Sequence, residues 1–229
     1  VQGIVVYAMI AANDIAGIIY NYSVTTMKRT IENRKTTFEN QMTERWSVLR
    51  ESDQSLKNRM KDFLEEKNIS IEDVKNDNQL QVEYLQMVFS ICLSQVDNSN
   101  CSGFFMCMTG NDYTGSISAN GFYVRDSEPY HVAEDNSDLL FVRGNKNISR
   151  SSNIALDADW TTNIELSGEG NDDFEKFIYE PWRAGRENTE ADVADLGYWS
   201  EPFRLGGEVR SGYDVITYSI PLIYEDEVY

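Results

Sequence analysis

Residues 102–126, SGFFMCMTGNDYTGSISANGFYVRD, contain two apolar segments joined by a connector rich in glycine, serine and asparagine. The first segment, residues 104–108, lies between Gly103 and Gly110. The second, residues 121–126, carries the aromatic and β-branched side chains that strands favour. Glycine and small polar residues mark turns between strands. The stretch therefore predicts a β-hairpin with a longish loop.

The sequence before this hairpin is helical in character. Residues 15–50 contain no proline and no glycine after Gly17, and an apolar seam runs along them with coiled-coil spacing. The seam consists of Val24, Ile31, Phe38, Met42 and Leu49. Lys35 interrupts it, so we expect a half-exposed helix. Such a helix can pack along its own domain or pair with its copy, and we expect a mixture of both, with a homodimer formed through this helix.

Two further amphipathic helices are expected, at residues 52–67 and 79–96, because apolar side chains recur there with helical spacing. Ser70, Glu72 and Asp73 lie in the short segment between them and resemble an acidic helix start. About the first hundred residues are therefore expected to be mostly α-helical.

The sequence after the hairpin is mixed. Residues 138–144 fit another strand or a short helix start, and residues 153–173 are polar and loop-like, with DADW and SGEGNDD as turns. Residues 174–188 predict a short helix that leads into an exposed loop, and residues 211–224 predict a strand. Helices first and strands second indicate an α+β fold, with a central antiparallel β-sheet flanked by helices and loops.

Both ends of the sequence suggest a longer parent protein. Residues 1–12 are apolar, but a membrane-spanning helix needs about 20 such residues, and the run has no basic start like that of a signal peptide. It is either the outer half of a transmembrane helix or a buried helix, and we favour a transmembrane helix that ends within residues 1–14. The last residues read as a strand, an acidic turn and the start of another strand, so we expect more chain after Tyr229.

The composition is that of an acidic folded protein. Lysine and arginine number 20 against 38 aspartates and glutamates, a net charge of −18, and 41% of the residues are hydrophobic. Such a charge argues against nucleic-acid binding, which needs basic groups to displace counterions from phosphates. It also disfavours docking of the domain on anionic lipid, so contact with a membrane is expected only through a flanking transmembrane helix.

Familiar catalytic and metal-binding motifs are absent from the sequence. It has no phosphate-binding loop, no serine-nucleophile or zinc-protease motif, and a single histidine, His131. Cys92, Cys101 and Cys107 are too few for a disulfide scaffold. Cys101 and Cys107 either close a small ring or leave Cys107 as a buried thiol. We expect no enzyme activity, no cofactor and no metal; a hydrolase that uses two carboxylates is a third hypothesis, without a particular pair.

The densest group of aromatic residues lies between residues 174 and 229. Aromatic walls with a few polar groups suit a small-molecule pocket, since the rings bury area and their polar atoms orient a ligand. The alternative interpretation is a protein core with a solvated acidic rim. The candidate ligand-binding residues are Tyr179, Glu180, Trp182, Arg183, Asp195, Tyr198, Trp199 and Tyr218.

Residues 181–203, PWRAGRENTEADVADLGYWSEPF, followed by VITYSIPL at residues 215–222, resemble the extracellular double Cache (dCache, tandem PAS-like) sensor domains of bacterial transmembrane receptors. The order of the parts is similar from about residue 15 onward: long helix, shorter helices, FFMCM and GFYVRD strands, DNSDLLFVRG, then the proline–tryptophan segment. The resemblance is strongest to sensors that precede diguanylate cyclase (GGDEF) or histidine kinase modules.

The resemblance implies a PAS-like module that binds a small ligand between its sheet and the segment around Trp182. The family pattern for amino acids, Arg-x-Trp-Tyr, departs here to Glu180-Pro181-Trp182-Arg183. The family's Pro-Tyr-x-Asp is replaced by Pro-Phe-Arg-Leu at residues 202–205. An α-amino acid held in the usual mode is therefore not expected.

The expected organisation is the end of a transmembrane helix at residues 1–14, a helical region with a long N-terminal helix at 15–97, and an incomplete PAS-like ligand-binding module at 98–229. The expected function is that of an extracytoplasmic small-molecule sensor in a bacterial membrane receptor, which signals through the long helix. Any cyclase or kinase module would lie elsewhere in the parent protein. The alternative is a cell-surface structural or protein-interaction module without a small-molecule ligand.

Overall fold

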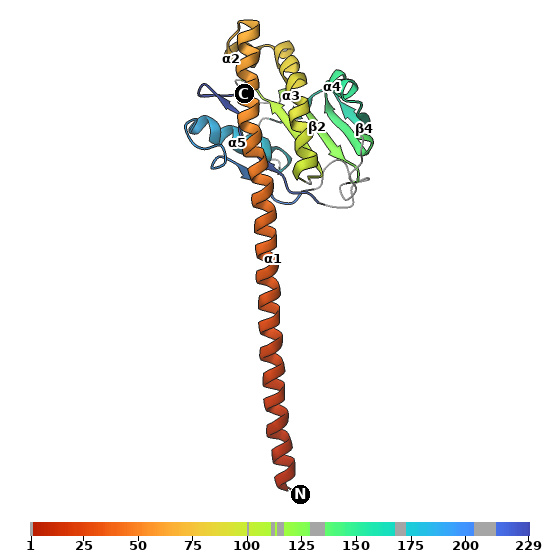
Figure 1. Ribbon diagram of the computed structural model, residues 1–229, viewed down its shortest axis with the longest axis vertical. Helices are drawn as coiled ribbons and strands as arrows, with labels where there is room; N and C mark the ends of the chain where they lie inside the picture. The colour runs from red at the N-terminus through yellow and green to blue at the C-terminus, as the bar shows by residue number, and fades with distance from the viewer. Residues whose placement is uncertain are drawn as a thin grey trace. The chain divides into compact units, whose positions relative to one another are not determined.

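The computed structural model contains all 229 residues. It describes residues 2–99, 101–110, 113, 117–128, 136–167, 173–203 and 214–229, without the side chains of residues 2–13, 45, 95–99 and 173–174. Contacts divide the chain into two units, residues 1–44 and residues 45–229. The division falls within the first helix, α1 (Gln2–Lys67), the long helix of Figure 1.

The first unit consists of the N-terminal part of α1. Nearly every side chain from residue 14 to residue 44 is exposed. Large apolar side chains are among them, and Ile31 and Phe38 of the seam are 66% and 54% exposed. Among the described residues, no helix contains a stretch long and apolar enough to span a membrane. The assignment of residues 1–14 to a transmembrane helix therefore stays a prediction.

The helix α1 continues through residues 50–52, where the sequence suggested a boundary between two helices. The hydroxyl of Ser52 donates to the carbonyl of Val48 at 2.8 Å, so this side chain is satisfied within the helix. The chain also has no glycine or proline there. The two helices expected at residues 15–50 and 52–67 are therefore one continuous helix.

Local hydrogen bonds define the end of α1 and the start of α2 (Ile71–Asn76). Asn68 has a φ of 54°, and the N–H of Ile69 donates to the carbonyl of Leu64 at 3.1 Å, as in a Schellman C-cap. Ser70 and Asp73 form a capping box, in which each side chain binds the other residue's backbone N–H. The acidic helix start expected at this point is confirmed, and the third helix, α3 (Asn78–Ser99), follows.

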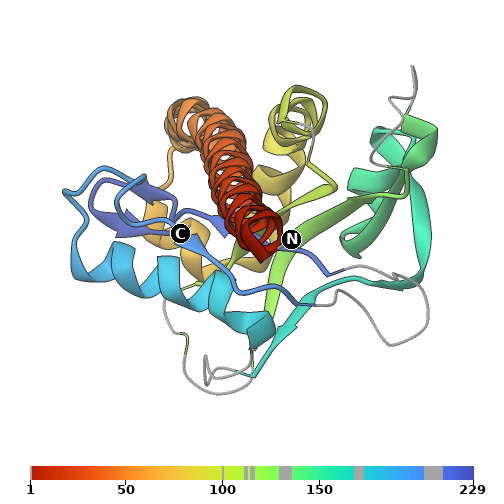
Figure 2. The ribbon, with the colours of Figure 1, turned by 90° about the horizontal axis from the view of Figure 1, so that it is seen from below.

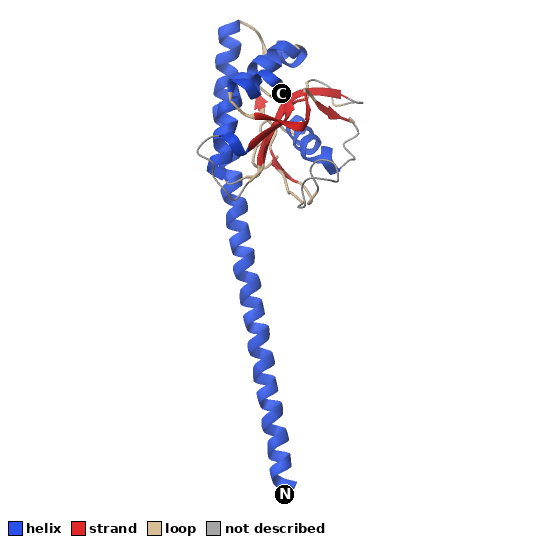
Figure 3. Ribbon diagram, turned by 90° about the vertical axis from the view of Figure 1, so that its right-hand side faces the viewer, coloured by secondary structure: helices blue, strands red, loops and turns tan. Residues whose placement is uncertain are grey.

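The main sheet has five strands (Figure 3): β1 (Gly103–Met108), β2 (Ile117–Asp126), β3 (Leu139–Gly144), β4 (Ala155–Thr161) and β5 (Ile164–Leu166). Its order is β1-β2-β3-β4, and β5 pairs with the beginning of β2. The hairpin predicted from residues 102–126 is confirmed as the antiparallel pair β1·β2. The sheet is mixed, however, because β3 and β4 are parallel. The α+β fold is confirmed, and the pairings of β2 with β1, β3 and β5 are antiparallel as expected, whereas β3·β4 was not expected to be parallel.

The parallel pair arises from the helical connection between β3 and β4. The short helices η1 (Asn136–Asp138) and α4 (Lys146–Ser151) lie before and after β3. The DADW segment belongs to β4, so its prediction as a turn was wrong. Acidic residues are depleted in strands, but here the Asp157 carboxylate accepts from the Arg125 guanidinium at 2.8 Å, and Trp160 Nε1 donates to the Gly144 carbonyl at 3.0 Å.

The larger core lies between the helices of the second unit and one face of the sheet. Phe89 of α3 packs against Phe122 of β2 in an edge-to-face contact, with ring centroids 5.0 Å apart. The largest fully buried side chains are Tyr84, Phe122, Phe141, Met60, Leu85, Met108, Ile148, Val74, Val88 and Val124. The C-terminal part of α1 therefore belongs to the core of the second unit.

The last part of the chain contains α5 (Asp173–Glu187) and four two-residue strands, β6 (Tyr198–Trp199), β7 (Tyr218–Ser219), β8 (Ile223–Tyr224) and β9 (Glu227–Val228). Figure 2 shows α5 beside these C-terminal segments. The continuous strand expected at residues 211–224 was wrong for the described residues, since Pro221 separates β7 from β8. The expected acidic turn is confirmed at Glu225 and Asp226, whose φ values of 49° and 65° suit a tight hairpin turn.

Candidate ligand-binding site

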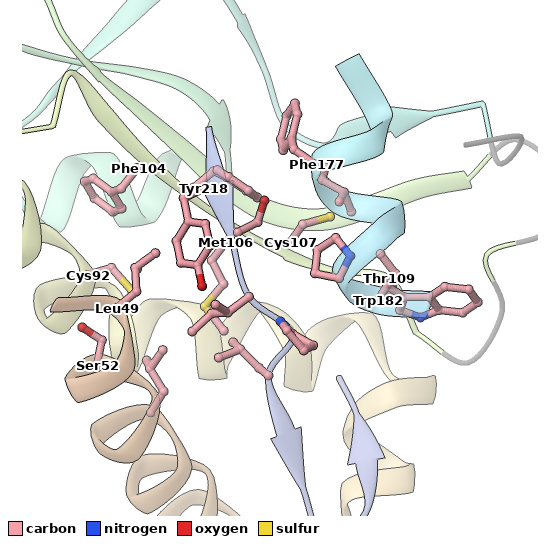
Figure 4. Close-up of a pocket in the computed structure, with 18 of the residues that line it drawn as sticks. Leu49, Ser52, Cys92, Phe104, Met106, Cys107, Thr109, Phe177, Trp182 and Tyr218 are labelled. Carbon is pink, nitrogen blue, oxygen red and sulfur yellow. The ribbon is translucent and has the colours of Figure 1, made fainter. Parts of the chain in front are cut away.

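A cavity of about 130 Å³ lies between β1, α5, the helices α1 and α3, and the C-terminal segment (Figure 4). Leu49, Ser52 and Leu56 of α1 line one end of it, together with Cys92 of α3. Trp182 of α5 also belongs to the lining, and Figure 4 shows its indole projecting from α5 away from Leu49 and Ser52. Residues 218–222 form another part of the wall.

The alternation of side chains along β1 places the cavity between two cores. Met106 and Met108 pack in the larger core, which α3 covers, whereas Phe105 and Cys107 pack in a second cluster with Phe177 of α5. Successive side chains of a strand point to opposite faces. In the described part of the chain β1 pairs only with β2, and β1 residues from both faces line the cavity.

No side chain of the described residues that line the cavity carries a charge at neutral pH. Aspartate, glutamate, lysine, arginine and histidine are all missing from the described lining. Burial raises the pKa of the thiols of Cys92 and Cys107 to about 12. Burial also raises the pKa of Tyr229 well above its usual value. These three groups are therefore neutral at physiological pH.

The polar atoms on the α3 side of the cavity are paired. The Tyr84 hydroxyl donates to the carbonyl of Leu56 at 3.1 Å and lies 3.3 Å from the hydroxyl of Tyr229. Leu56 and Tyr229 line the cavity, and Tyr84 lies behind them, fully buried. This small network fixes one wall and offers no free donor from Tyr84.

Two polar atoms of lining residues have no partner among the described residues. They are the buried Oγ of Ser219 and the buried Nε1 of Trp182. Trp182 packs against Tyr113, with ring centroids 5.3 Å apart, and the buried hydroxyl of Tyr113 is also unpaired in the described part of the chain. Leaving a buried donor unsatisfied costs about 1–3 kcal/mol. All three atoms are almost inaccessible to a water-sized molecule, so they lie near the cavity without facing it openly.

The structure brings only Trp182 and Tyr218 of the eight candidate residues to the cavity wall. Tyr179 packs against Tyr113 and Trp182, and Tyr198 belongs to the second cluster. Trp199 packs on Tyr218, with ring centroids 4.6 Å apart. Trp182, Tyr198 and Trp199 therefore do not line one cavity together.

The charged candidates lie outside the cavity lining. Glu180 and Arg183 form an ion pair of 2.7 Å on α5, and Arg183 also contacts Glu187 at 3.2 Å. The ion pair with Glu180 raises the pKa of Arg183 further. Asp195 is exposed in a turn. None of these three candidates is placed to hold a ligand within the cavity.

The sequence did not identify the α1, α3 and β1 residues of the wall as site residues. Leu49 was identified only as part of the helix seam, and Cys92 only as one of three cysteines. Nothing local distinguishes Ser52 from other helical serines. Their common feature is proximity in the fold, which no spacing in the sequence encodes.

Other candidates from the sequence have clear outcomes. All three cysteines are free, so Cys101 and Cys107 form no ring, and Cys107 is the buried thiol of the alternative. His131 lies outside the described residues. Within the described ranges, no group of three or more histidine, cysteine, aspartate or glutamate side chains is arranged to hold a metal ion.

Comparison with known proteins gives no relative. No family model matches the sequence, and no curated protein and no solved structure matches it either. The fold and the cavity define an α+β protein with an internal, uncharged cavity next to a long helix.

Proposed function

We propose that the chain is the extracytoplasmic sensor domain of a bacterial transmembrane receptor, and that it binds a small molecule in the cavity between β1, α5 and α1. The observation that carries the proposal is a mostly apolar cavity whose lining residues Ser219 and Trp182 each have a buried, unpaired polar atom. The resemblance of residues 181–203 to dCache sensors, and the α+β fold with a long N-terminal helix, support the same function.

The position of the cavity suggests how a ligand could act on the long helix. Leu49, Ser52 and Leu56 of α1 belong to the wall, so a molecule in the cavity contacts the helix directly. A ligand shifts a conformational equilibrium only as far as it binds one state better than the other. We propose that the ligand favours one arrangement of α1 and that the domain has no catalytic activity of its own.

A homodimer through the N-terminal part of α1 belongs to the proposal. The exposed apolar side chains of this unit include Tyr22, Met27, Ile31 and Phe38. In the second unit, by contrast, Leu156 and Ile216 are the large apolar side chains that are strongly exposed among the described residues. The parent protein would be anchored in the cell membrane through a flanking transmembrane helix, with this domain outside the cytoplasm.

Thermal unfolding in the presence of a metabolite library tests the sensor function. A ligand at 100 times its dissociation constant adds about 2.7 kcal/mol to the free energy of unfolding, which raises the melting temperature by about 5–10 °C in a domain of this size. Absence of any stabilising compound, together with a crystal structure in which the cavity is closed, would contradict the proposal.

Sedimentation equilibrium of an Ile31→Asp variant tests the dimer. A charge in an apolar helix pair is expected to weaken association at least about tenfold, since the carboxylate must lose water without gaining a partner. Leu156→Asp, at an exposed apolar position of β4, is the matched control and should leave association unchanged. Equal association constants for the two variants would exclude this helix as the interface.

A further inference from the structure

The size of the cavity limits what it can hold. Its volume of about 130 Å³ lies below the roughly 300–1,000 Å³ of pockets for drug-sized ligands. An apolar cavity of about 150 Å³ takes up benzene. The fitting molecule is therefore compact, about the size of one six-membered ring with a small substituent.

The charged side chains near the cavity form ion pairs with one another, although Oδ1 of Asp53 is buried without a partner among the described residues. Glu180 and Arg183 form the ion pair of 2.7 Å on α5. On α1, Asp53 accepts from Lys57 at 2.8 Å, and Arg50 binds Asp192 at 2.6 Å. A carboxylate or an ammonium group in the cavity would lose its hydration with no counter-charge in the described lining, and this transfer is costly.

The unpaired polar atoms define the hydrogen bond that a ligand can make. An indole N–H only donates, whereas a serine hydroxyl can donate or accept. Ser219 is 94% buried, given its exposed fraction of 6%, so its hydroxyl has little access to bulk water. Both atoms are nearly closed to a water-sized molecule, so a ligand oxygen that accepts from Trp182 Nε1 or Ser219 Oγ requires a small shift of that side chain.

We propose that the cavity takes a compact, uncharged, largely apolar molecule with one hydrogen-bond acceptor, such as an alcohol, a phenol or a ketone, and that it rejects charged α-amino acids. This inference rests on the proposed function, because it names the ligand class of the same site. It goes beyond that function because the volume of the cavity and the side chains of its wall specify the size, charge and hydrogen bonding of the ligand.

Three probes of the same shape test the ligand class: benzyl alcohol, benzoate and benzylamine. Each is titrated into the isotopically labelled chain while the indole N–H signals of its four tryptophans are followed by NMR. The Trp182 signal is assigned with a Trp182→Phe variant. We expect benzyl alcohol to shift the Trp182 signal and to bind at least about tenfold more tightly than either charged probe.

A variant of the wall separates the hydrogen bond from the apolar contact. Ser219→Ala should weaken the binding of benzyl alcohol about threefold to tenfold, the usual value of a neutral hydrogen bond, and leave toluene binding unchanged. Ser90→Ala, at an exposed position of α3, is the matched control and should change neither affinity. If Ser219→Ala does not fold, the comparison of probes on the unaltered chain still decides the ligand class.

The outcomes distinguish this inference from the proposed function. Tighter binding of benzoate or benzylamine at Trp182 would overturn the uncharged class and leave a small-molecule sensor standing. If none of the probes binds while the metabolite screen yields a ligand, only this inference fails. If neither experiment yields a ligand, both fail.

Discussion

The two sides of β1 differ in how their buried tyrosine hydroxyls are paired, although Oδ1 of Asp53, near the Tyr84 network, is also buried without a partner among the described residues. On the side that α3 covers, the hydroxyl of Tyr84 bonds to Leu56 and contacts Tyr229, and the amide of Gln81 donates to the carbonyl of Lys75 at 2.9 Å. On the side that α5 covers, Tyr113 OH and Trp182 Nε1 are buried without a partner among the described residues.

The cavity lies at the boundary between the two sides of β1, because β1 residues from both faces line it. Phe105 and Cys107 pack on the α5 side and line the cavity, and the lining residues Trp182 and Ser219 each have a buried polar atom that is unpaired among the described residues. Buried polar groups in folded proteins are nearly always bonded. The Tyr84 hydroxyl therefore helps to hold the α3 side together, whereas the α5 side has a tyrosine hydroxyl and an indole N–H without a partner among the described residues.

The largest expected effect comes from truncating a buried side chain on the side of β1 that α3 covers. Phe122→Ala should lower the free energy of unfolding by about 3–5 kcal/mol, because Phe122 is fully buried and its removal leaves a cavity. Phe105→Ala is the matched variant on the other side. Phe105 is partly exposed and borders an existing cavity, so its loss should be about 1–2 kcal/mol smaller. Urea unfolding measures both variants, and equal losses of unfolding free energy would contradict the expected difference between the two sides.

A pair of tyrosine variants compares one buried hydroxyl from each side of β1. Tyr84→Phe removes a bonded hydroxyl and should destabilise the protein by about 1–2 kcal/mol. Tyr113→Phe removes a hydroxyl without a described partner and should be neutral or slightly stabilising, since no hydrogen bond is lost. Thermal and urea unfolding give both values. A larger loss for Tyr113→Phe than for Tyr84→Phe would show that the Tyr113 hydroxyl is bonded after all.

The smallest expected effect is on the pH dependence contributed by Asp53. Burial raises the pKa of Asp53 above its usual 3.8, against the opposing effect of Lys57. The folded state thus binds this proton more tightly than the unfolded chain, and the contribution of Asp53 to stability falls as the pH rises from about 3.8 through the raised pKa. Asp53→Asn should remove this slope.

The control for this pH effect is Asp62→Asn, whose side chain is 64% exposed. The difference in unfolding free energy between each variant and the unaltered chain is measured from pH 3 to pH 7. The difference should increase with pH more steeply for Asp53→Asn than for Asp62→Asn. A flat difference for both would mean that Asp53 titrates alike in the folded and unfolded chains.

Local signals in the sequence predicted much of the fold. The capping box at Ser70 and Asp73 and the apolar segments of residues 102–126 act over a few residues, so a window of sequence contains the whole cause. The strand β4 was missed because its acidic residues contradict strand propensity, and their neutralising partner, Arg125, lies far away in the chain. Tertiary pairing overrode the local preference.

The candidate site was less predictable than the fold. Aromatic content led to Trp182 and Tyr218, but aromatic residues pack in cores as well as in pockets, and Trp199 packs on Tyr218. The cavity joins Ser52 of α1 to Ser219 near the other end of the chain. Only the folded arrangement reveals such a juxtaposition, or that the charged candidates Glu180 and Arg183 pair with each other.

The most direct measurement is a crystal structure of the domain soaked with benzyl alcohol. The account predicts electron density for one molecule between Trp182, Ser52 and Ser219, with its oxygen within hydrogen-bond distance of the Ser219 hydroxyl or the Trp182 indole. A cavity filled by the protein's own side chains, with Trp182 Nε1 and Ser219 Oγ bonded to protein atoms, would contradict it.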